Sequence, residues 1–249
     1  MATLLRQLRR IRPELDDPEG AIRAGLVLVD GRFVTNPASQ VRAGAAITVR
    51  ARTPLRGSTK LAAALDAFAV DPAGRVVLDA GAAAGGFTTV LLERAAARVY
   101  AVDAGHGQLV GSLRQNPRVV NLEATNIADL DRRRVPDQVE LLTLDLSYLA
   151  LADAVVQLTE RVDLAPGADL VGLVKPMFEL RLPTAPTDRE TVDRAVRQAV
   201  AGIEAAGWLV VAATESPVEG ARGAREAWIH AKWPADHGGN RRDPQATKE

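Results

Sequence analysis

The stretch from Asp79 to Phe87 follows the apolar run Val76–Leu78 and carries an acid and closely spaced glycines. A strand that ends in such a turn and enters a helix forms a pocket for a nucleotide-type ligand. The spacing D-x-G-x-x-x-G-G-F differs from that of diphosphate sites and lacks their lysine. We therefore expect a ligand with a cationic amino-acid end and a nucleoside, as in S-adenosylmethionine. The expected contacts are Asp79, Gly81, Gly85, Gly86 and Phe87, since glycines let a ligand approach the backbone.

A second acid ends the next apolar run. Residues 98–102 read as a strand that stops at Asp103, about 20 residues after the glycine turn. In nucleotide-binding α/β sheets an acid at this place accepts hydrogen bonds from the ribose hydroxyls. The two acids favour a pocket of the S-adenosylmethionine type over a turn without a ligand. NAD remains the weaker alternative.

Composition limits the other classes of site. The chain has 249 residues, 47% of them hydrophobic and 25% charged, which is ordinary for a globular protein. Lys and Arg balance Asp and Glu at 31 each, so any RNA affinity must come from local clusters. The absence of cysteine excludes disulfides, Cys-ligated zinc and thiol catalysis, and three scattered histidines predict no metal site. No apolar run is long enough to span a membrane, so we expect a cytoplasmic protein without a membrane partner.

The first 50 residues predict a small module. Residues 2–12 and 18–24 have helical patterns, and residues 26–34 read as a hairpin around an Asp-Gly turn, with a last strand at 46–49. The first helix is amphipathic, and its polar face carries Arg6, Arg9 and Arg10, which suit contacts with RNA phosphates. A solvated helix face explains the same arginines equally well.

Residues 50–57 form a basic linker that includes Arg56, a further candidate RNA contact. Ser58 is expected to cap a helix that places Leu61, Leu65 and Phe68 on one face. Lys60 would then lie in the first turn, where the helix dipole disfavours a cation.

Strand and helix patterns alternate through the rest of the chain. We expect helices at 107–115, 149–162 and 188–206, and strands at 118–122, 141–147, 169–175, 208–214 and 226–232. This order predicts an α/β fold with a doubly wound, Rossmann-like sheet and a site at the carboxyl ends of its strands. The polar residues from Pro234 onward predict a disordered tail.

Charged residues end several of these strands. Asp145 and Lys175 follow apolar runs, as Asp79 and Asp103 do, so the fold would gather all four at one edge. A lysine at the end of a buried strand needs an acid partner, and Asp145 is available. Thr125 and Asn126 lie in a loop where an adenine could be held.

Two resemblances follow from these motifs. Residues 25–31, with Val34, Pro37, Val41 and Ile47, resemble the S4-type RNA-binding module. The chain as a whole resembles the TlyA family, which joins such a module to an FtsJ-like 2′-O-methyltransferase domain. The pieces that carry this resemblance, in order, are residues 56–61, 79–87, 103–109, 125–126, 145–149 and 175–179.

The resemblance implies a domain order and roles for particular residues. It gives an S4-like domain at 1–50, a linker at 51–57, a methyltransferase domain at 58–233 and a tail at 234–249. It implies cofactor contacts at Gly85, Phe87, Asp103, Asn126 and Asp145. The implied catalytic tetrad is Lys60, Asp145, Lys175 and Glu226.

The implied reaction is methyl transfer from S-adenosylmethionine to a ribose 2′-hydroxyl of RNA, with ribosomal RNA or ribosomal subunits as partners. Lys175 would engage the hydroxyl, Lys60 would position it, and Asp145 and Glu226 would orient the two lysines. The loop 180–186 is shorter and less basic than the family's, and Gly223-Ala224 replaces its usual Gly-Asn. Three alternatives stay open: an enzyme acting on a small-molecule alcohol, a non-catalytic RNA-binding or ribosome-assembly factor, and a membrane-active, haemolysin-like protein.

Overall fold

The computed structural model describes residues 2–23, 25–49, 55–220 and 223–235, with the side chain of Arg56 outside this description. The chain forms two compact units, Met1–Pro54 with Val110–Asn116, and Leu55–Leu109 with Pro117–Glu249. Most of the expected linker at 51–57 and of the expected tail at 234–249 lies outside the described residues.

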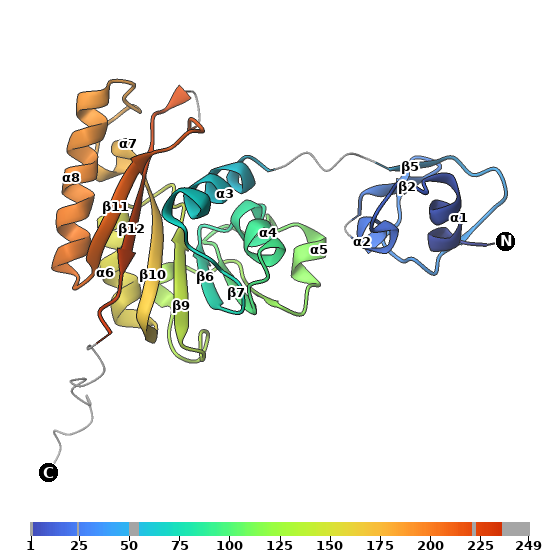
Figure 1. Cartoon of the computed structure of the whole chain (residues 1–249), viewed down its shortest axis with the longest axis horizontal. Coiled ribbons are helices and arrows are strands. Elements are labelled where there is room, and N and C mark those ends of the chain that lie inside the picture. The colour runs from blue at the N-terminus through green and yellow to red at the C-terminus, as the bar shows by residue number, and fades with distance from the viewer. Residues whose placement is uncertain (1, 24, 50–54, 221–222, 236–249) are drawn as a thin grey trace, which may run out of the picture. The chain divides into compact units, whose positions relative to one another are not determined.

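The described residues before Leu55 form two helices, a three-stranded sheet and a two-stranded sheet (Figure 1), and α5 (Gly111–Arg114) is also assigned to the first unit. The predicted hairpin is present: β2 and β3 pair around Asp30 and Gly31, which both have positive φ, as an Asp-Gly turn of this type requires. The apolar face of α1 buries Leu4 and Leu8. The pair β1–β4 was not predicted, because each strand has only two residues. The elements are β1 (Ala2–Thr3), α1 (Leu4–Ile11), α2 (Pro18–Arg23), β2 (Val27–Val29), β3 (Arg32–Phe33), β4 (Gln40–Val41) and β5 (Ile47–Val49).

The second unit is built on a seven-stranded sheet with the order β11-β12-β10-β9-β6-β7-β8. Strands β10, β9, β6, β7 and β8 are parallel, and β12 runs antiparallel between β10 and β11. This confirms the doubly wound α/β prediction. The strands are β6 (Val76–Ala80), β7 (Arg98–Val102), β8 (Val119–Leu122), β9 (Val139–Leu144), β10 (Leu164–Val174), β11 (Leu209–Glu215) and β12 (Ala227–Lys232).

Helices cover both faces of this sheet (Figure 1). On β12 alternate residues point to opposite faces, so Ile229 joins the core under α6 and α8, while His230 stacks on Phe68 of α3. Burial on both faces explains why the central strands read as continuous apolar runs. The remaining elements are α3 (Arg56–Phe68), α4 (Gly86–Glu93), α5 (Gly111–Arg114), η1 (Ile127–Asp129), α6 (Leu151–Arg161), α7 (Pro176–Glu179) and α8 (Arg189–Ala205).

Helix α3 corrects one expectation. It begins at Arg56, with Leu55 at the N-cap position, so Ser58 does not cap it and Lys60 lies beyond its first turn. The Ser58 hydroxyl instead donates to the carbonyl of Gly86 at 3.0 Å. A Cβ on Gly86 would lie 3.0 Å from the Cα of Gly57, so these glycines let α3 pack closely against α4. The close approach fixes the helix that carries Lys60.

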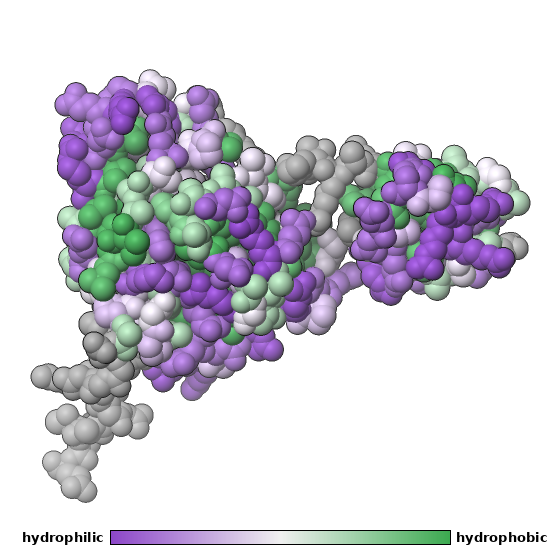
Figure 2. Space-filling view, in the orientation of Figure 1, coloured by the Kyte–Doolittle hydropathy of each residue, from purple (hydrophilic) through white to green (hydrophobic). Residues whose placement is uncertain are grey.

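The edge strand β11 exposes Leu209 and Val211, which are 60% and 56% accessible. Figure 2 shows hydrophobic atoms in the region where Figure 1 places this strand. None of the described helices is long and apolar enough to cross a membrane.

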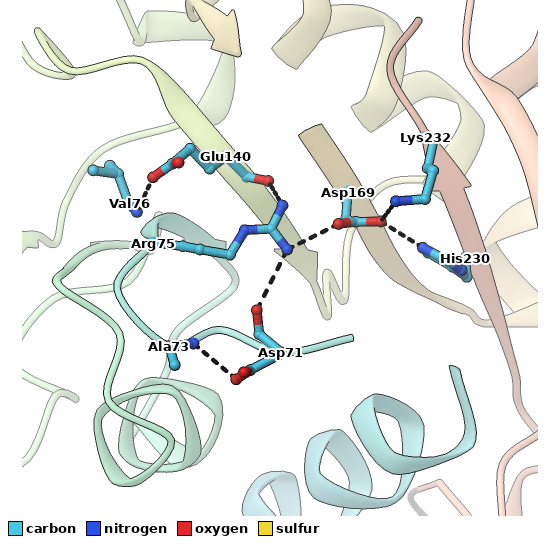
Figure 3. A network of polar contacts seen from close by, with 8 residues as sticks. All are labelled: Asp71, Ala73, Arg75, Val76, Glu140, Asp169, His230 and Lys232. Carbon is cyan, nitrogen blue, oxygen red and sulfur yellow. Dashed lines mark hydrogen bonds and ion pairs between the residues drawn. The ribbon is translucent and has the colours of Figure 1, made fainter. Parts of the chain in front are cut away.

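A charged network lies at the amino ends of the central strands (Figure 3). Asp169 on β10 accepts from Arg75 at 2.8 Å, contacts His230 Nε2 at 2.7 Å and lies 3.0 Å from the Lys232 ammonium. Burial raises the pKa of Asp169, but the hydrogen bonds from His230, Lys232 and Arg75 outweigh it and hold this pKa well below its usual range. Arg75 also donates to the carbonyl of Glu140 on β9, so the network joins β9, β10 and β12.

Replacing Asp169 by asparagine should therefore lower the free energy of unfolding at pH 7 by about 3–5 kcal/mol, the usual loss when one partner of a buried ion pair is removed. Because the folded pKa is depressed, this stabilisation is present above the unfolded value of about 3.9 and is lost as the pH falls through the folded one. Urea unfolding at pH 7 measures the first effect, and a series from about pH 5 down to about pH 2 follows the decline that begins near the unfolded pKa. Asp66→Asn is the control, since its exposed pair with Arg94 should contribute under about 1 kcal/mol. Equal losses in the two variants would contradict this account.

Candidate active site

The glycine turn follows β6 as predicted, and Gly81 and Gly85 have φ values of 90° and 94°. The N–H groups of Gly81 and Ala82 both donate to the carbonyl of Val102 on β7. A Cβ on Gly81 would lie 2.4 Å from the carbonyl oxygen of Asp145, so the turn passes directly against the end of β9. Contacts within the protein therefore account for Gly81, as they do for Gly86.

Asp79 differs from expectation. Its side chain is fully buried and accepts hydrogen bonds from Thr88 at 2.7 Å and Thr143 at 3.1 Å. Burial raises the pKa of Asp79 to about 7, against the two hydroxyl donors, which lower it. The carboxyl group supports the glycine turn from inside the fold and does not line the cavity at its mouth. Phe87 is likewise buried, with its ring centroid 5.7 Å from that of Trp228.

A first cavity of about 260 Å³ opens at the carboxyl ends of β6, β7 and β9. Asp103 lines it, and both of its carboxylate oxygens bind backbone, one accepting from Ala83 at 2.8 Å and the other from Gly105 at 2.7 Å. Asn126 caps η1 by accepting from Ala128, between the lining residues Thr125 and Ile127. Of the predicted cofactor contacts, Gly81, Asp103 and Asp145 line the cavity, whereas Asp79, Gly85, Gly86, Phe87 and Asn126 are not among its lining residues.

A second cavity, of about 380 Å³, adjoins the first. Ser147 lines both, so their walls meet at this residue. The charged groups of the second cavity are Lys60, Lys175, Arg225 and Glu226. The rest of its lining is largely apolar and comes from Pro176, Met177, Phe178, Ala185, Pro186 and Ala224.

Lys175 lies at the boundary between the cavities. Its ammonium is 2.5 Å from Asp145 Oδ1, which confirms the predicted ion pair, and it donates a hydrogen bond to Ser147 Oγ at 2.8 Å. The nitrogen therefore lies between Asp145, which lines the first cavity, and Ser147, which lines both. Ser147 was not among the predicted site residues, although its place two residues after a strand-end acid is a usable signal.

Lys60 and Glu226 form a second pair, in direct contact through a short hydrogen bond. Their side chains are 7% and 6% exposed, so the pair is deeply buried between α3 and the start of β12. Gly220 passes close over it, since a Cβ there would lie 2.3 Å from Glu226 Oε1. The structure thus brings together all four residues predicted as a catalytic set.

The arrangement suits chemistry on a hydroxyl group. No group of three or more His, Cys, Asp or Glu side chains in the described part of the chain could hold a metal ion. The two lysines, each paired with an acid, place hydrogen-bonding nitrogens beside a cavity, and such a nitrogen accepts a proton only in its neutral form.

Asp103→Ala should weaken S-adenosylmethionine binding at least tenfold. The change removes a charged acceptor for a ribose hydroxyl, worth about 1.5–3 kcal/mol, and also frees the Ala83 and Gly105 N–H groups that shape the cavity. Calorimetric titration measures the affinity. Asp129→Ala is the control, because this exposed acid does not line the cavity. Unchanged affinity in Asp103→Ala would place the cofactor elsewhere.

Comparison with known proteins agrees with this geometry. Residues 54–233 match the model of the FtsJ-like methyltransferase family. The chain is 39% identical over 224 residues to the 16S/23S rRNA (cytidine-2′-O)-methyltransferase TlyA of Mycobacterium tuberculosis, covering 86% of this chain and 83% of that one. It is 30% identical over 217 residues to Hemolysin A of Brachyspira hyodysenteriae, covering 84% and 90%.

A solved structure from Streptococcus thermophilus that carries the hemolysin label has a TM-score of 0.69 at 28% identity, and covers 88% of this chain and 82% of that one. The family match covers all the residues that line both cavities and all four charged site residues. Members of this family use S-adenosylmethionine as the methyl donor, which the sequence predicted from the glycine turn and the two acids. The chain belongs to the FtsJ-like methyltransferases and, among them, to the TlyA family.

Proposed function

We propose that this protein transfers a methyl group from S-adenosylmethionine to a ribose 2′-hydroxyl of RNA, with ribosomal RNA as the substrate. The observation that carries the proposal is the place of Lys175, held by Asp145 and Ser147 where the two cavities meet. The curated relative from Mycobacterium tuberculosis is named for the same reaction on cytidine in 16S and 23S rRNA. A ribosomal substrate also implies that the protein acts in the cytoplasm.

The residues of the first cavity fit the cofactor. Asp103, at the end of β7, provides a fixed carboxylate that accepts hydrogen bonds from the ribose hydroxyls. Asp145 provides a second negative charge in the same cavity, beside Lys175. S-adenosylmethionine supplies an electrophilic methyl group on a positively charged sulfonium. Asp145 would offset part of that charge.

The second cavity would receive the acceptor nucleotide. Lys175 enters this step as the neutral amine, after its ammonium has released a proton to solvent. Its Nζ lone pair then accepts the hydrogen bond, and finally the proton, of the attacking hydroxyl, since a neutral alcohol is a weak nucleophile. Lys60, which lines the same cavity, positions the hydroxyl, and Glu226 orients Lys60. The apolar wall suits the faces of a planar base.

We further propose that the first unit is an S4-type RNA-binding domain at residues 1–50. Arg6, Arg9 and Arg10 lie exposed on α1, whose opposite face is buried, and Arg10 donates to Gln7 at 2.8 Å. The remaining candidate contact, the side chain of Arg56, lies outside the described residues.

The triple variant Arg6→Ala, Arg9→Ala, Arg10→Ala should bind RNA more weakly and with a flatter dependence on salt. Each phosphate contact that is lost means that fewer counterions are released from the RNA on binding. The steepness of log affinity against log salt concentration therefore falls by about 0.7–0.9 per contact. Filter binding to ribosomal RNA fragments between 50 and 300 mM KCl, roughly the range over which such slopes are measured, gives the slope. Arg23→Ala is the matched control, because Arg23 is already paired with Glu19. An unchanged slope in the triple variant would move the RNA surface away from α1.

The proposed reaction is tested with labelled S-adenosylmethionine and ribosomal subunits or their extracted RNA. Nuclease digestion should yield a 2′-O-methylated nucleoside that is absent from reactions without protein. Methylation of a base, or of a small alcohol in preference to RNA, would overturn the proposal. Binding of RNA without any methylation would favour the assembly-factor alternative.

A further inference from the structure

Glu179 is a buried acid with no part in the reaction proposed above. It ends α7, four residues after Lys175, and is 1% exposed. Its Oε2 accepts a hydrogen bond from the backbone N–H of Leu151 at 2.8 Å, and its Oε1 has no hydrogen-bond partner in the described part of the chain. Leu151 is the first residue of α6 and follows Asp145 by six residues.

Glu179 caps α6 from another element. The N-cap residue of α6 is Ala150, whose side chain has no acceptor, so the free N–H groups at this helix start have no local side-chain partner. A carboxylate at a helix N-terminus is favourable because it faces the positive end of the helix dipole. The carboxyl group of Glu179 meets this need across the fold.

The backbone of Glu179 is fixed as well. Its N–H donates to the carbonyl of Lys175 at 3.1 Å, and its own carbonyl accepts from the side chain of Gln198 on α8 at 2.5 Å. The single turn of α7 therefore joins Lys175 rigidly to Glu179. Glu179 in turn joins α7 to the start of α6 through its side chain, and to α8 through its carbonyl.

The direct pairing of β9 with β10 ends at Leu144 and Gly172, before either catalytic side chain. The sheet still fixes the backbone a little further, since the Asp145 N–H donates to the carbonyl of Ala80 at 3.0 Å and β10 pairs with β12 as far as Val174. Beyond these points the segments 146–151 and 175–179 leave the ladder. In the described residues they are joined on the cavity side by the contacts of Lys175 with Asp145 and Ser147, and on the far side by Glu179 with Leu151.

The position is costly for an acid. Burial raises the pKa of Glu179, while the backbone N–H groups of Leu151 and Ala152 lower it and nearby Asp153 raises it again. A buried carboxyl group with one oxygen that makes no hydrogen bond lowers the stability of the fold. The hydrogen bond from Leu151 to the other oxygen links the two segments that carry Asp145 and Lys175, and this link is a reason for an acid at this position.

We propose that Glu179 is a positioning residue: its bond to Leu151 holds Lys175 beside Asp145. The methylation test of this inference rests on the proposed function. We expect that loss of the hydrogen-bond acceptor at position 179 slows the methyl-transfer step without weakening cofactor binding. The reason is that a displacement of a catalytic group by about 1 Å costs up to about 100-fold in rate.

Two substitutions separate the hydrogen bond from the packing. Glu179→Gln keeps an oxygen that accepts from Leu151, and Glu179→Met keeps a similar length but removes the acceptor. We expect Glu179→Met to lower the single-turnover rate by about 10- to 100-fold, while its affinity for S-adenosylmethionine stays within about threefold of the wild type. For Glu179→Gln, both the rate and the affinity should stay within about threefold of the wild type. Asp153→Asn is the matched control, since Asp153 is an acid beside the same helix start that makes no bond to α7; it should retain the wild-type rate.

A second readout needs no RNA. Reductive methylation of lysine amines with formaldehyde, followed by mass spectrometry, should show faster labelling of Lys175 in Glu179→Met than in the wild type, with Lys232 as internal reference. Wild-type labelling and a wild-type rate in a folded Glu179→Met protein would overturn the inference, as would equal damage in the Gln and Met variants. If the wild type methylates no RNA, the proposed function fails, and the labelling result alone decides the role of Glu179.

Discussion

Replacement of Lys175 by alanine should lower the single-turnover rate of methyl transfer by about 10²–10⁴, the usual contribution of a positioned acid–base group. The physical reason is that Lys175 lines the second cavity and its Nζ contacts Asp145 and Ser147, which line the first. S-adenosylmethionine affinity should change by only a few fold, because Asp103 and the glycine turn that shape the first cavity are untouched. Single-turnover methylation and calorimetric titration of the same protein measure the two quantities.

A structural lysine would behave differently. If Lys175 serves only to neutralise Asp145, the alanine variant leaves an uncompensated carboxylate and loses stability, and the activity of the folded fraction stays intact. Lys175→Arg sharpens the distinction. Arginine can replace the ion pair with Asp145, but its guanidinium does not lose a proton, so it should restore the melting temperature and not the rate. Full activity in a folded Lys175→Ala protein would remove Lys175 from the mechanism.

The fold was largely predictable because burial on both faces of a parallel sheet leaves long apolar runs. The strand that ends at Asp103 and the pairing of Lys175 with Asp145 both follow from that pattern. Helix starts were less predictable. Ser58 has the side chain of an N-cap residue, but close packing of Gly57 on Gly86 lets α3 begin earlier, and the hydroxyl bonds α4 instead.

The sequence predicted which residues gather near the site better than it predicted what each side chain contacts there. Asp79 stands where a ligand contact is expected, yet its oxygens accept hydrogen bonds inside the fold from Thr88, at the start of the next helix, and from Thr143, 64 residues later. Sequence spacing cannot show which hydroxyls reach a buried acid. The same limit hid Glu179, whose partner Leu151 lies 28 residues earlier and contributes only a backbone N–H.

Glu226→Ala should abolish methylation and also lower the free energy of unfolding by about 3–5 kcal/mol. Its partner Lys60 has a side chain that is only 7% exposed, so the alanine variant leaves a buried ammonium without its counterion. Stability and activity would therefore fall together, and this single variant cannot separate a structural pair from a catalytic one.

The double variant Lys60→Met, Glu226→Leu separates them. Two apolar side chains of similar length replace a buried ion pair, and such replacements are often neutral or stabilising, so the melting temperature should return to near the wild-type value. The cavity would then lack the ammonium that positions the hydroxyl. We expect the single-turnover rate to stay at least about 100-fold below the wild type, with S-adenosylmethionine affinity unchanged. Wild-type methylation in this stable double variant would show that Lys60 and Glu226 only hold α3 against β12, and would leave the chemistry to Lys175 and Asp145 alone.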